Sequence, residues 1–409
     1  MKELAQHAAP GTMVLRGLSE RVASIGWGRL VLWAVALSGA AAMVYRLGWG
    51  LGASTNLSDD WPWGWWIAVD VMGGVALAAG AFVVAAWVHV FGRHRYEVLA
   101  KPAVLTGFLG YLMVVVGLLM DIGRPYRIWH PIVMWQPHSV MFEVAWCVMC
   151  YTTVLALEFS PVAFEGLGWR RAARRVRRAI VPLVILGVMF STLHQSSLGS
   201  LLLIAPYRMN PLWYSPLLPV FYFASAVAAG LATVQLEASA AGRFYGHRVG
   251  SALMEGLSRG LVWVLVLNAA LRVADWVVRG TGPWMGPVTL ESALAAAEVG
   301  LGMLVPAALL AVRSLRRRSA VRLWAAWMVV AGVLMNRIDS SLVAMRQSAS
   351  SAYWPSVLEF VVTAGIIAGG MLAYDCVARH WPLFEAAAEP TPERAAAEHH
   401  RKTVEAPAS

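Results

Sequence analysis

The sequence has few charged residues and few cysteines for its length. Of its 409 residues, 14% are Asp, Glu, Lys or Arg and 59% are hydrophobic, and the mean hydropathy is +0.60. Soluble globular proteins carry about 25% charged residues, so this composition excludes an ordinary soluble fold. The three cysteines, Cys147, Cys150 and Cys376, lack the second close pair that a four-cysteine iron–sulfur or zinc site needs. We expect them to be packing residues.

A cleavable signal peptide and a soluble domain are not expected either. The first 28 residues are polar to amphipathic, and no small-residue cleavage site follows the first apolar run. We therefore predict a cytoplasmic N-terminal arm (1–28), one membrane domain (29–379) and a disordered cytoplasmic tail (380–409), which is low in bulky apolar residues. Such a chain acts as the membrane part of a larger complex or as a transporter.

Long apolar runs fill most of the sequence. A helix needs about 20 mostly apolar residues to cross a bilayer, and ten runs meet this requirement. We predict an all-α polytopic membrane protein whose ninth span is short, because Arg337 and Asp339 interrupt it. The expected spans centre on 30–45, 65–91, 103–120, 140–159, 180–205, 217–236, 260–278, 290–312, 324–336 and 357–374.

The net charge of +10 is distributed unevenly along the chain. If the N-terminus lies inside, the connections on the inner side hold 25 of the 33 Lys and Arg residues. This positive-inside bias predicts a multi-pass protein of the bacterial inner membrane with both termini cytoplasmic. It also explains the positive charge without a nucleic-acid partner. The arginine-rich connections 170–178 and 313–318 are expected to face anionic lipid.

Ionisable residues gather where the third and fourth apolar runs are joined. A charge at a bilayer edge is costly unless it is paired or used, so this connection is a candidate functional site. Two other interpretations stay open. Asp121 and Arg124 form an ion pair that only fixes the loop, or His130 and His138 are simply interfacial histidines. The residues concerned are Asp121, Arg124, Arg127, His130, His138 and Glu143.

Polar residues inside the spans gather in the outer half of the expected bilayer. His194, followed by Gln195, is the only histidine deep in a span, and Asp70 lies about two turns below the outer end of the second span. A transport path would need polar groups in both halves. An outer pocket fits a quinone better, since its two carbonyls accept hydrogen bonds and its reduction takes up two protons. For His194, Asp70 and Glu143, a purely structural role stays open as the alternative. The other outer-half residues are Asn268, Arg272, Asp275, Glu298, Arg337, Asp339 and Glu359.

Haem and metal are not expected in this chain. A b-type haem held by two histidines needs facing histidines on neighbouring spans. His194 stands alone at depth, and His89 lies at the inner end of its span. We therefore predict that the chain binds no haem and no metal.

Four segments resemble the NrfD/PsrC family of quinone-linked membrane subunits, and within it the HybB-type subunit of nickel–iron hydrogenases. The longest of them contains the stretch DIGRPYRIWHPIVMWQPH, and another reads STLHQSSLGSL. The residues that show the resemblance are 62–82, 103–161, 191–201 and 210–237.

The resemblance implies two four-helix bundles with flanking helices. It also implies a non-autonomous oxidoreductase subunit that passes electrons between a quinone (menaquinone or ubiquinone) and a ferredoxin-like iron–sulfur subunit. That subunit would lie beside the large and small subunits of a hydrogenase, and proton translocation would be an additional activity, with Glu158 and Glu237 on its route. A secondary transporter and a purely structural anchor are the alternatives.

Roles for individual residues follow from the same resemblance. His194 and Gln195 would hydrogen-bond the quinone head group, and Asp70 would assist proton transfer. The mouth of the site would be shaped by Asp121, Arg124, His130 and Glu143.

Overall fold

The computed structural model describes residues 26–384, and these form helices and connecting loops without a β-strand. Ten helical stretches are long and apolar enough to cross a membrane. The prediction of an all-α protein with about ten spans is therefore confirmed. In order, the spans are α2 (Trp27–Trp49), η1 to η2 (Trp66–Val90), η3 with α6 (His94–Asp121), α8 (Val140–Gly166), α10 (Ile180–Leu203), α11 (Leu218–Phe244), α12 (Ser251–Arg279), α13 to α14 (Leu290–Ala311), α16 with η6 (Ser319–Ser348) and α17 (Val357–His380).

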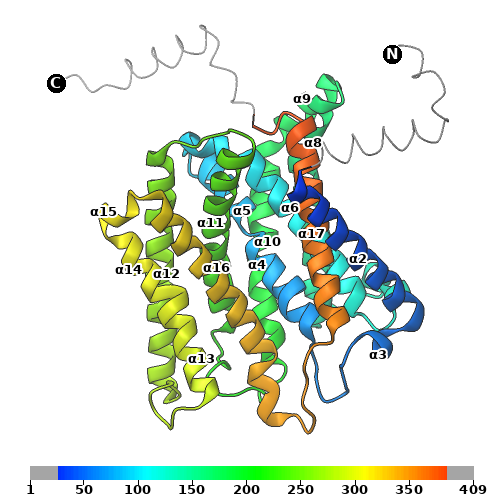
Figure 1. Ribbon diagram of the computed structural model, residues 1–409, viewed down its shortest axis with the longest axis vertical. Coiled ribbons are helices and arrows are strands. Elements are labelled where there is room, and N and C mark those ends of the chain that lie inside the picture. Colours follow the sequence, from blue (N-terminus) through cyan, green and yellow to red (C-terminus); the bar gives the residue numbers. More distant parts are fainter. Residues whose placement is uncertain (1–25, 385–409) are drawn as a thin grey trace, which may run out of the picture.

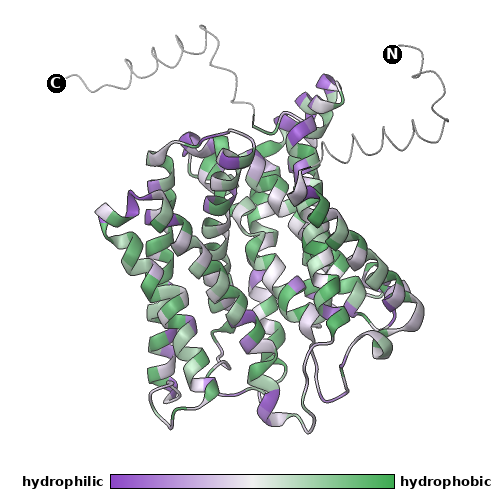
Figure 2. Cartoon of the chain, in the orientation of Figure 1, coloured by the Kyte–Doolittle hydropathy of each residue, from purple (hydrophilic) through white to green (hydrophobic). Residues whose placement is uncertain are grey.

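Short helices cap the two ends of the molecule. The arginine-rich helices α9 (Arg170–Arg178) and α15 (Arg313–Arg316) both lie toward the end at which the described chain begins and finishes (Figure 1). We call this end the basic end and the other one the opposite end. Hydrophobic residues cover the middle of the helices, whereas hydrophilic residues collect at the two ends (Figure 2). This distribution is that of a membrane-spanning protein. At the opposite end lie α3 (Leu51–Ser54), η4 (Pro125–Arg127) and α7 (His130–Val133).

The ten spans form two bundles and one flanking pair. Spans two to five pack around one another as the first bundle, and α11, α12, α14 and α16 form the second. Helix α11 joins the bundles because it also packs on α10 and α5 (Gly80–Ala85). Helices α2 and α17 pack along each other, and α17 also packs on α6. The chain segments 1–28 and 380–409 lie largely outside the described residues, so their assignment stays a prediction.

Two spans contain π-helical turns. Span two consists of η1 (Trp66–Gly73), α4 (Gly74–Leu77), α5 and η2 (Ala86–Val90), in which η1 and η2 are π-helical. Span eight contains a third π-helical turn, η5 (Gly300–Leu304), between α13 (Leu290–Val299) and α14 (Val305–Ala311). Such turns are frequent at functional sites.

Span nine is longer than the sequence predicted. Helix α16 (Ser319–Ser341) continues past Arg337 and Asp339 instead of stopping before them. Both side chains are buried, with exposed fractions of 0% and 2%. The helix continues because these charged groups meet other polar groups inside the second bundle and do not face lipid.

Candidate functional site

His194 lies in the interior of the first bundle, on α10. Its side chain is fully buried, and neither ring nitrogen has a hydrogen-bond partner among the described residues. The ring of Tyr111, on α6, lies 5.6 Å from the imidazole, centroid to centroid. Tyr111 in turn meets the edge of Tyr151, on α8, at 4.6 Å. Three helices thus bring three polar aromatic side chains together at one depth.

Several polar atoms around His194 are buried and unsatisfied within the described chain. They are the hydroxyls of Tyr111, Tyr151 and Ser191, both nitrogens of His194, and Oε1 of Gln195. Burying a polar atom without a hydrogen bond costs about 1–3 kcal/mol, so a group of them in one place calls for an explanation. The chemistry of this set, with hydroxyl donors and an imidazole, suits a ligand that carries carbonyl or hydroxyl oxygens.

Further polar residues continue from His194 toward both ends of the bundle. One turn toward the opposite end, Ser197 donates a hydrogen bond to Glu143, near the start of α8. Toward the basic end, Glu158 lies two turns along α8 from Tyr151, and a Cβ placed on Gly187 would lie 2.8 Å from its Oε1. We call Glu143, Ser197, His194, Ser191 and Glu158 the polar column, because they follow the α8–α10 contact.

Gln195 turns away from the polar column toward span two. Its Nε2 donates a hydrogen bond to the carbonyl of Val75 at 2.9 Å. This bond fixes the amide, and it leaves Oε1 as the free acceptor. The predicted pair of His194 and Gln195 is therefore adjacent, with one side chain already anchored.

Asp70 belongs to a second group of polar residues, between span two and the flanking helices. It lies on the π-helical turn η1 and accepts a hydrogen bond of 2.7 Å from Thr363 of α17. A Cβ on Gly117 of α6 would lie 2.7 Å from the Cβ of Asp70, so a glycine is needed for this approach. Asp121 lies one turn beyond Gly117, and its buried Oδ1 has no partner in the described part of the chain.

Two charged residues that the sequence analysis left out of the site complete this group. Arg46 of α2 is 1% exposed and donates to the carbonyls of Met120 and Ile122, each at 2.8 Å. Glu359, at the start of α17, is fully buried and accepts hydrogen bonds from Tyr353 and from the backbone N–H of Ser356. In the sequence, Arg46 is a single arginine within an apolar run, and this pattern was the signal that could have identified it as a functional residue. We call Asp70, Asp121, Arg46, Glu359 and Thr363 the Asp70 cluster.

The loop before α17 holds the Asp70 cluster in place from the opposite end. Tyr353 accepts a hydrogen bond of 3.0 Å from the backbone N–H of Trp65 while it donates to Glu359. Burial, together with the hydrogen bond to this carboxylate, raises the pKa of Tyr353. The phenol therefore stays protonated and keeps its donor role at neutral pH.

The polar column and the Asp70 cluster lie on different faces of α6. Tyr111 contacts His194 and Gly117 contacts Asp70. Six residues of α-helix correspond to about 9 Å of rise and a rotation of about 120° between the two positions. The structure therefore separates Asp70 from the His194 site that the sequence grouped with it.

Arg124 and His130 lie in the connection that follows α6 at the opposite end. Arg124 is exposed and His130 is partly exposed. Within the described chain, Arg124 forms no ion pair with Asp121, whose charged neighbour is Arg46. The loop itself is held on α8, since Trp146 donates to the carbonyl of Pro131 at 2.9 Å.

The second bundle contains a buried charge cluster that the sequence analysis noted but did not select. Glu298 accepts hydrogen bonds from Trp213 at 2.6 Å and from Asn336 at 2.8 Å. Arg272 lies 3.9 Å from the same carboxylate. Arg337 donates to Asn336 at 2.9 Å and covers the ring of Tyr222. We call Arg272, Glu298, Asn336, Arg337 and Asp339 the second-bundle cluster.

Ten spans around buried polar groups define a multi-pass integral membrane protein with interior sites. The chain belongs to the NrfD family: the family described as "Polysulphide reductase, NrfD" matches residues 53–339. The match covers all of the first bundle and most of the second.

Named relatives extend over nearly the whole chain. It is 37% identical over 366 residues to a protein of Nitratidesulfovibrio vulgaris, covering 87% of this chain and 94% of the relative. It is 32% identical over 346 residues (83% and 88%) to the "Probable Ni/Fe-hydrogenase 2 b-type cytochrome subunit" of Escherichia coli. It is 27% identical over 383 residues (84% and 90%) to the "Menaquinone reductase, integral membrane subunit" of Nitratidesulfovibrio vulgaris.

The expectation that the chain binds no haem is wrong in the light of these relatives. The Escherichia coli protein is named a b-type cytochrome subunit, and that name denotes a haem protein. The expectation rested on the lack of a second deep histidine, but haem iron also takes Met, Cys or Tyr ligands, so a histidine count was too narrow a criterion. No group of three or more His, Cys, Asp and Glu suited to a metal ion occurs in residues 26–384.

Proposed function

We propose that the chain is the quinone-reactive membrane subunit of a periplasm-facing oxidoreductase of the hydrogen:quinone type. It passes electrons between an iron–sulfur partner subunit and menaquinone or ubiquinone. The names of the hydrogenase and menaquinone reductase relatives support this class of reaction. The observation that carries the proposal is the set of unpartnered polar atoms around His194.

The head group of the quinone binds beside His194. A quinone carbonyl accepts a hydrogen bond, and a neutral imidazole donates one and then relays a proton as the ring is reduced. Tyr111 and Tyr151 supply further hydroxyl donors and aromatic faces for a flat ring. When bound, the quinone supplies the two-electron chemistry, while these residues orient it and exchange its protons.

The residues at the opposite end serve entry and docking. Glu143 and Ser197 connect the buried site to that end. Asp121 and Asp70 supply a second proton-exchanging group beside span two, and Arg124 and His130 contact the partner subunit or lipid head groups. The exposed aromatic side chains of the same loop, among them Tyr126 (68%), Trp129 (51%) and Trp135 (62%), favour a protein contact there. The partners are a ferredoxin-like subunit and the two hydrogenase subunits, on the periplasmic side of the bacterial inner membrane.

The proposal includes a proton route from the basic end to the His194 site. Glu158 belongs to the polar column, below Tyr151. Glu237, on α11, accepts hydrogen bonds from Thr106 at 2.7 Å and from Tyr374 at 2.8 Å. Both carboxyl groups lie between the basic end and the His194 site.

The substitution His194→Ala tests the proposal. It removes one buried donor to the head group, which costs about 1–3 kcal/mol, or roughly a tenfold to hundredfold loss in affinity or rate. We expect quinone reduction by the assembled complex to fall by that factor. Reduction of an artificial dye by the partner subunits should stay unchanged, because the dye bypasses this chain.

Arg170→Ala provides the control, since Arg170 lies on exposed α9 at the basic end. This variant should retain both activities. If the His194→Ala complex reduces quinone at the unmodified rate, His194 is a packing residue and the proposed site is wrong.

A further inference from the structure

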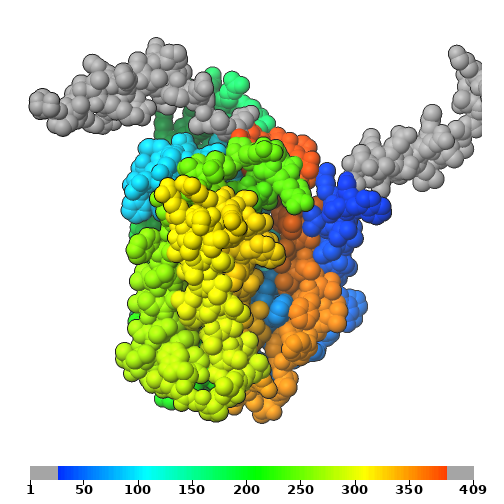
Figure 3. Space-filling model, turned by 60° about the vertical axis from the view of Figure 1, so that its left-hand side comes forward, coloured from blue at the N-terminus to red at the C-terminus, as the bar shows by residue number. Residues whose placement is uncertain are grey.

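A cavity opens at the basic end, where the first and second bundles meet. Its volume is about 360 Å³, and it lies between the turn that links spans two and three and the first turns of α12. This turn, coloured light blue, lies at the surface of the basic end in Figure 3. The polar column, the Asp70 cluster and the second-bundle cluster contribute no residue to it. The lining residues are Trp87, Phe91, Arg93, Arg95, Tyr96 and Gly256.

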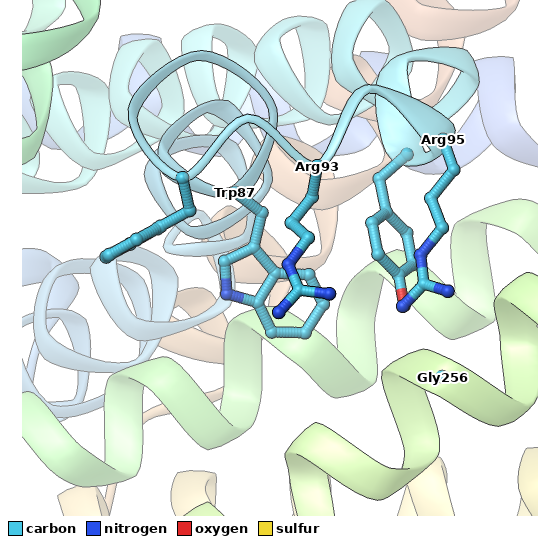
Figure 4. A pocket seen from close by; sticks show the side chains of 6 residues that line it. Trp87, Arg93, Arg95 and Gly256 are labelled. Atoms are coloured by element: carbon cyan, nitrogen blue, oxygen red, sulfur yellow. The ribbon is translucent and has the colours of Figure 1, made fainter. Parts of the chain in front are cut away.

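The backbone of the turn directs two arginines to the same side. Span two ends in the π-helical turn η2, and Gly92 follows with a φ of +63°, a conformation that favours glycine. The N–H of Arg93 then donates to the carbonyl of Trp87 at 2.8 Å, which closes the turn before η3 (His94–Tyr96) begins. Figure 4 shows the guanidinium groups of Arg93 and Arg95 extending in the same direction, toward α12.

Aromatic rings form the base of the cavity and are packed directly on α12. Tyr96 is 3% exposed, and its ring lies 5.1 Å from that of Trp87. A Cβ on Gly256 would collide with the Tyr96 hydroxyl, and one on Gly260 would lie 2.9 Å from the Trp87 ring. The two glycines therefore let α12 approach the rings. A ligand on this base would contact both bundles.

The arginines of the cavity are available to a ligand. Neither Arg93 nor Arg95 forms an ion pair with any residue in the described range 26–384, and both are exposed. Arg95 lies over the Tyr96 ring at 4.9 Å, which orients its guanidinium. Two such planar forks match the oxygens of one phosphate group. Phe91, with 67% of its side chain exposed, adds an apolar surface beside them.

We propose that this cavity binds the phosphate of an anionic phospholipid, with its acyl chains lying along Phe91 and Trp87. Its position favours a lipid over a soluble phosphate, because the cavity lies where two apolar spans end and an exposed phenylalanine borders the arginines. Basic pockets between spans are common sites for anionic head groups. The bound lipid would join the two bundles at their basic end. This site is independent of the quinone proposal.

Lipid binding to the purified full-length chain in detergent tests the proposal. Phosphatidylglycerol, phosphatidylcholine and inorganic phosphate would each be added, and bound lipid would be measured by native mass spectrometry alongside the melting temperature. We expect phosphatidylglycerol to be retained and to raise the melting temperature. The double variant Arg93→Gln with Arg95→Gln should bind it about tenfold to thirtyfold more weakly.

The matched control is Arg243→Gln with Arg248→Gln, which removes the same charge from exposed positions at the same end, outside the cavity lining. It should retain the affinity of the unmodified chain. A second variant, Phe91→Ser, keeps both arginines and should weaken phosphatidylglycerol binding by removing an acyl-chain contact. Equal binding of phosphatidylglycerol to the Arg93/Arg95 variant and to the control would overturn the proposal. Equal stabilisation by phosphatidylcholine or by inorganic phosphate would do the same, because it would assign the effect to general lipid contact or to a free anion.

Discussion

At the scale of single residues, this protein differs from a simple apolar bundle in the charges that it buries. Arg272, Glu298 and Arg337 are each at most 2% exposed, although they lie on three helices of the second bundle. Moving a charge out of water costs several kcal/mol, and only paired, hydrogen-bonded charges recover that cost. Glu298 accepts hydrogen bonds from Trp213 and Asn336 and lies 3.9 Å from Arg272, so it stabilises the polar groups around it.

We therefore predict that Glu298→Gln destabilises the protein strongly. Removing one partner of a buried pair typically costs about 3–5 kcal/mol, because the remaining charge stays buried. The free energy of unfolding in mixed detergent micelles would measure this loss. Glu291→Gln, on the same helix but only partly buried, should cost less than about 1 kcal/mol. Equal losses in the two variants would show that the second-bundle cluster does not depend on this carboxylate.

At the scale of helices, close packing depends on small residues at a few positions. The flanking helices α2 and α17 cross at Gly39 and Gly365, and a Cβ on either glycine would collide with the backbone of the other helix. On the same two helices, Arg46 reaches the end of α6 and Thr363 reaches Asp70. Not every glycine of α2 is needed for close packing, because Gly48 has open space around it. The position along the helix therefore decides whether a glycine is required.

The substitutions Gly39→Ala and Gly48→Ala should have opposite effects. At Gly39 the added methyl group forces α2 and α17 apart, which costs about 1–3 kcal/mol. At Gly48 the same change meets no atom and improves helix propensity by up to about 1 kcal/mol. Melting temperatures in one detergent would compare them. A Gly39→Ala protein as stable as Gly48→Ala would contradict the observed α2–α17 crossing.

At the scale of the whole molecule, the distribution of basic residues predicts the orientation in the membrane. The arginine-rich helices α9 and α15 lie at the end where the described chain begins and finishes (Figure 1). An even number of spans is required for that arrangement, and ten are present. From the positive-inside bias we predict that the basic end faces the cytoplasm and that the His194 site lies in the half nearer the periplasm.

Reporter fusions test this orientation. Fusions after Lys101, Arg178 and Arg318 should report the cytoplasm, because the basic connections stay on that side. Fusions after Asp60 and Gly282 should report the periplasm. Two or more reversed signals would refute the orientation and the periplasmic position of the proposed quinone site.

The membrane class, the ten spans and the position of His194 deep within a span were predicted from the sequence alone. These properties are local: hydropathy over about 20 residues predicts a span, and position along a helix predicts depth. Counting charges also predicted correctly that the connections near Arg170 and Arg313 share one end of the molecule. The same local reasoning failed for span nine, since it treated Arg337 and Asp339 as the end of a helix that continues.

Which polar groups meet depends on how the helices pack in three dimensions. Arg46 reaches Met120 across 74 positions of sequence, and Trp213 reaches Glu298 across 85. Asp70 and His194, grouped by depth alone, lie against different faces of α6. The physical reason is that depth depends on one helix, whereas the choice of partner depends on how each helix is rotated against its neighbours. That rotation is set by close packing at positions such as Gly117, which a single helical sequence does not reveal.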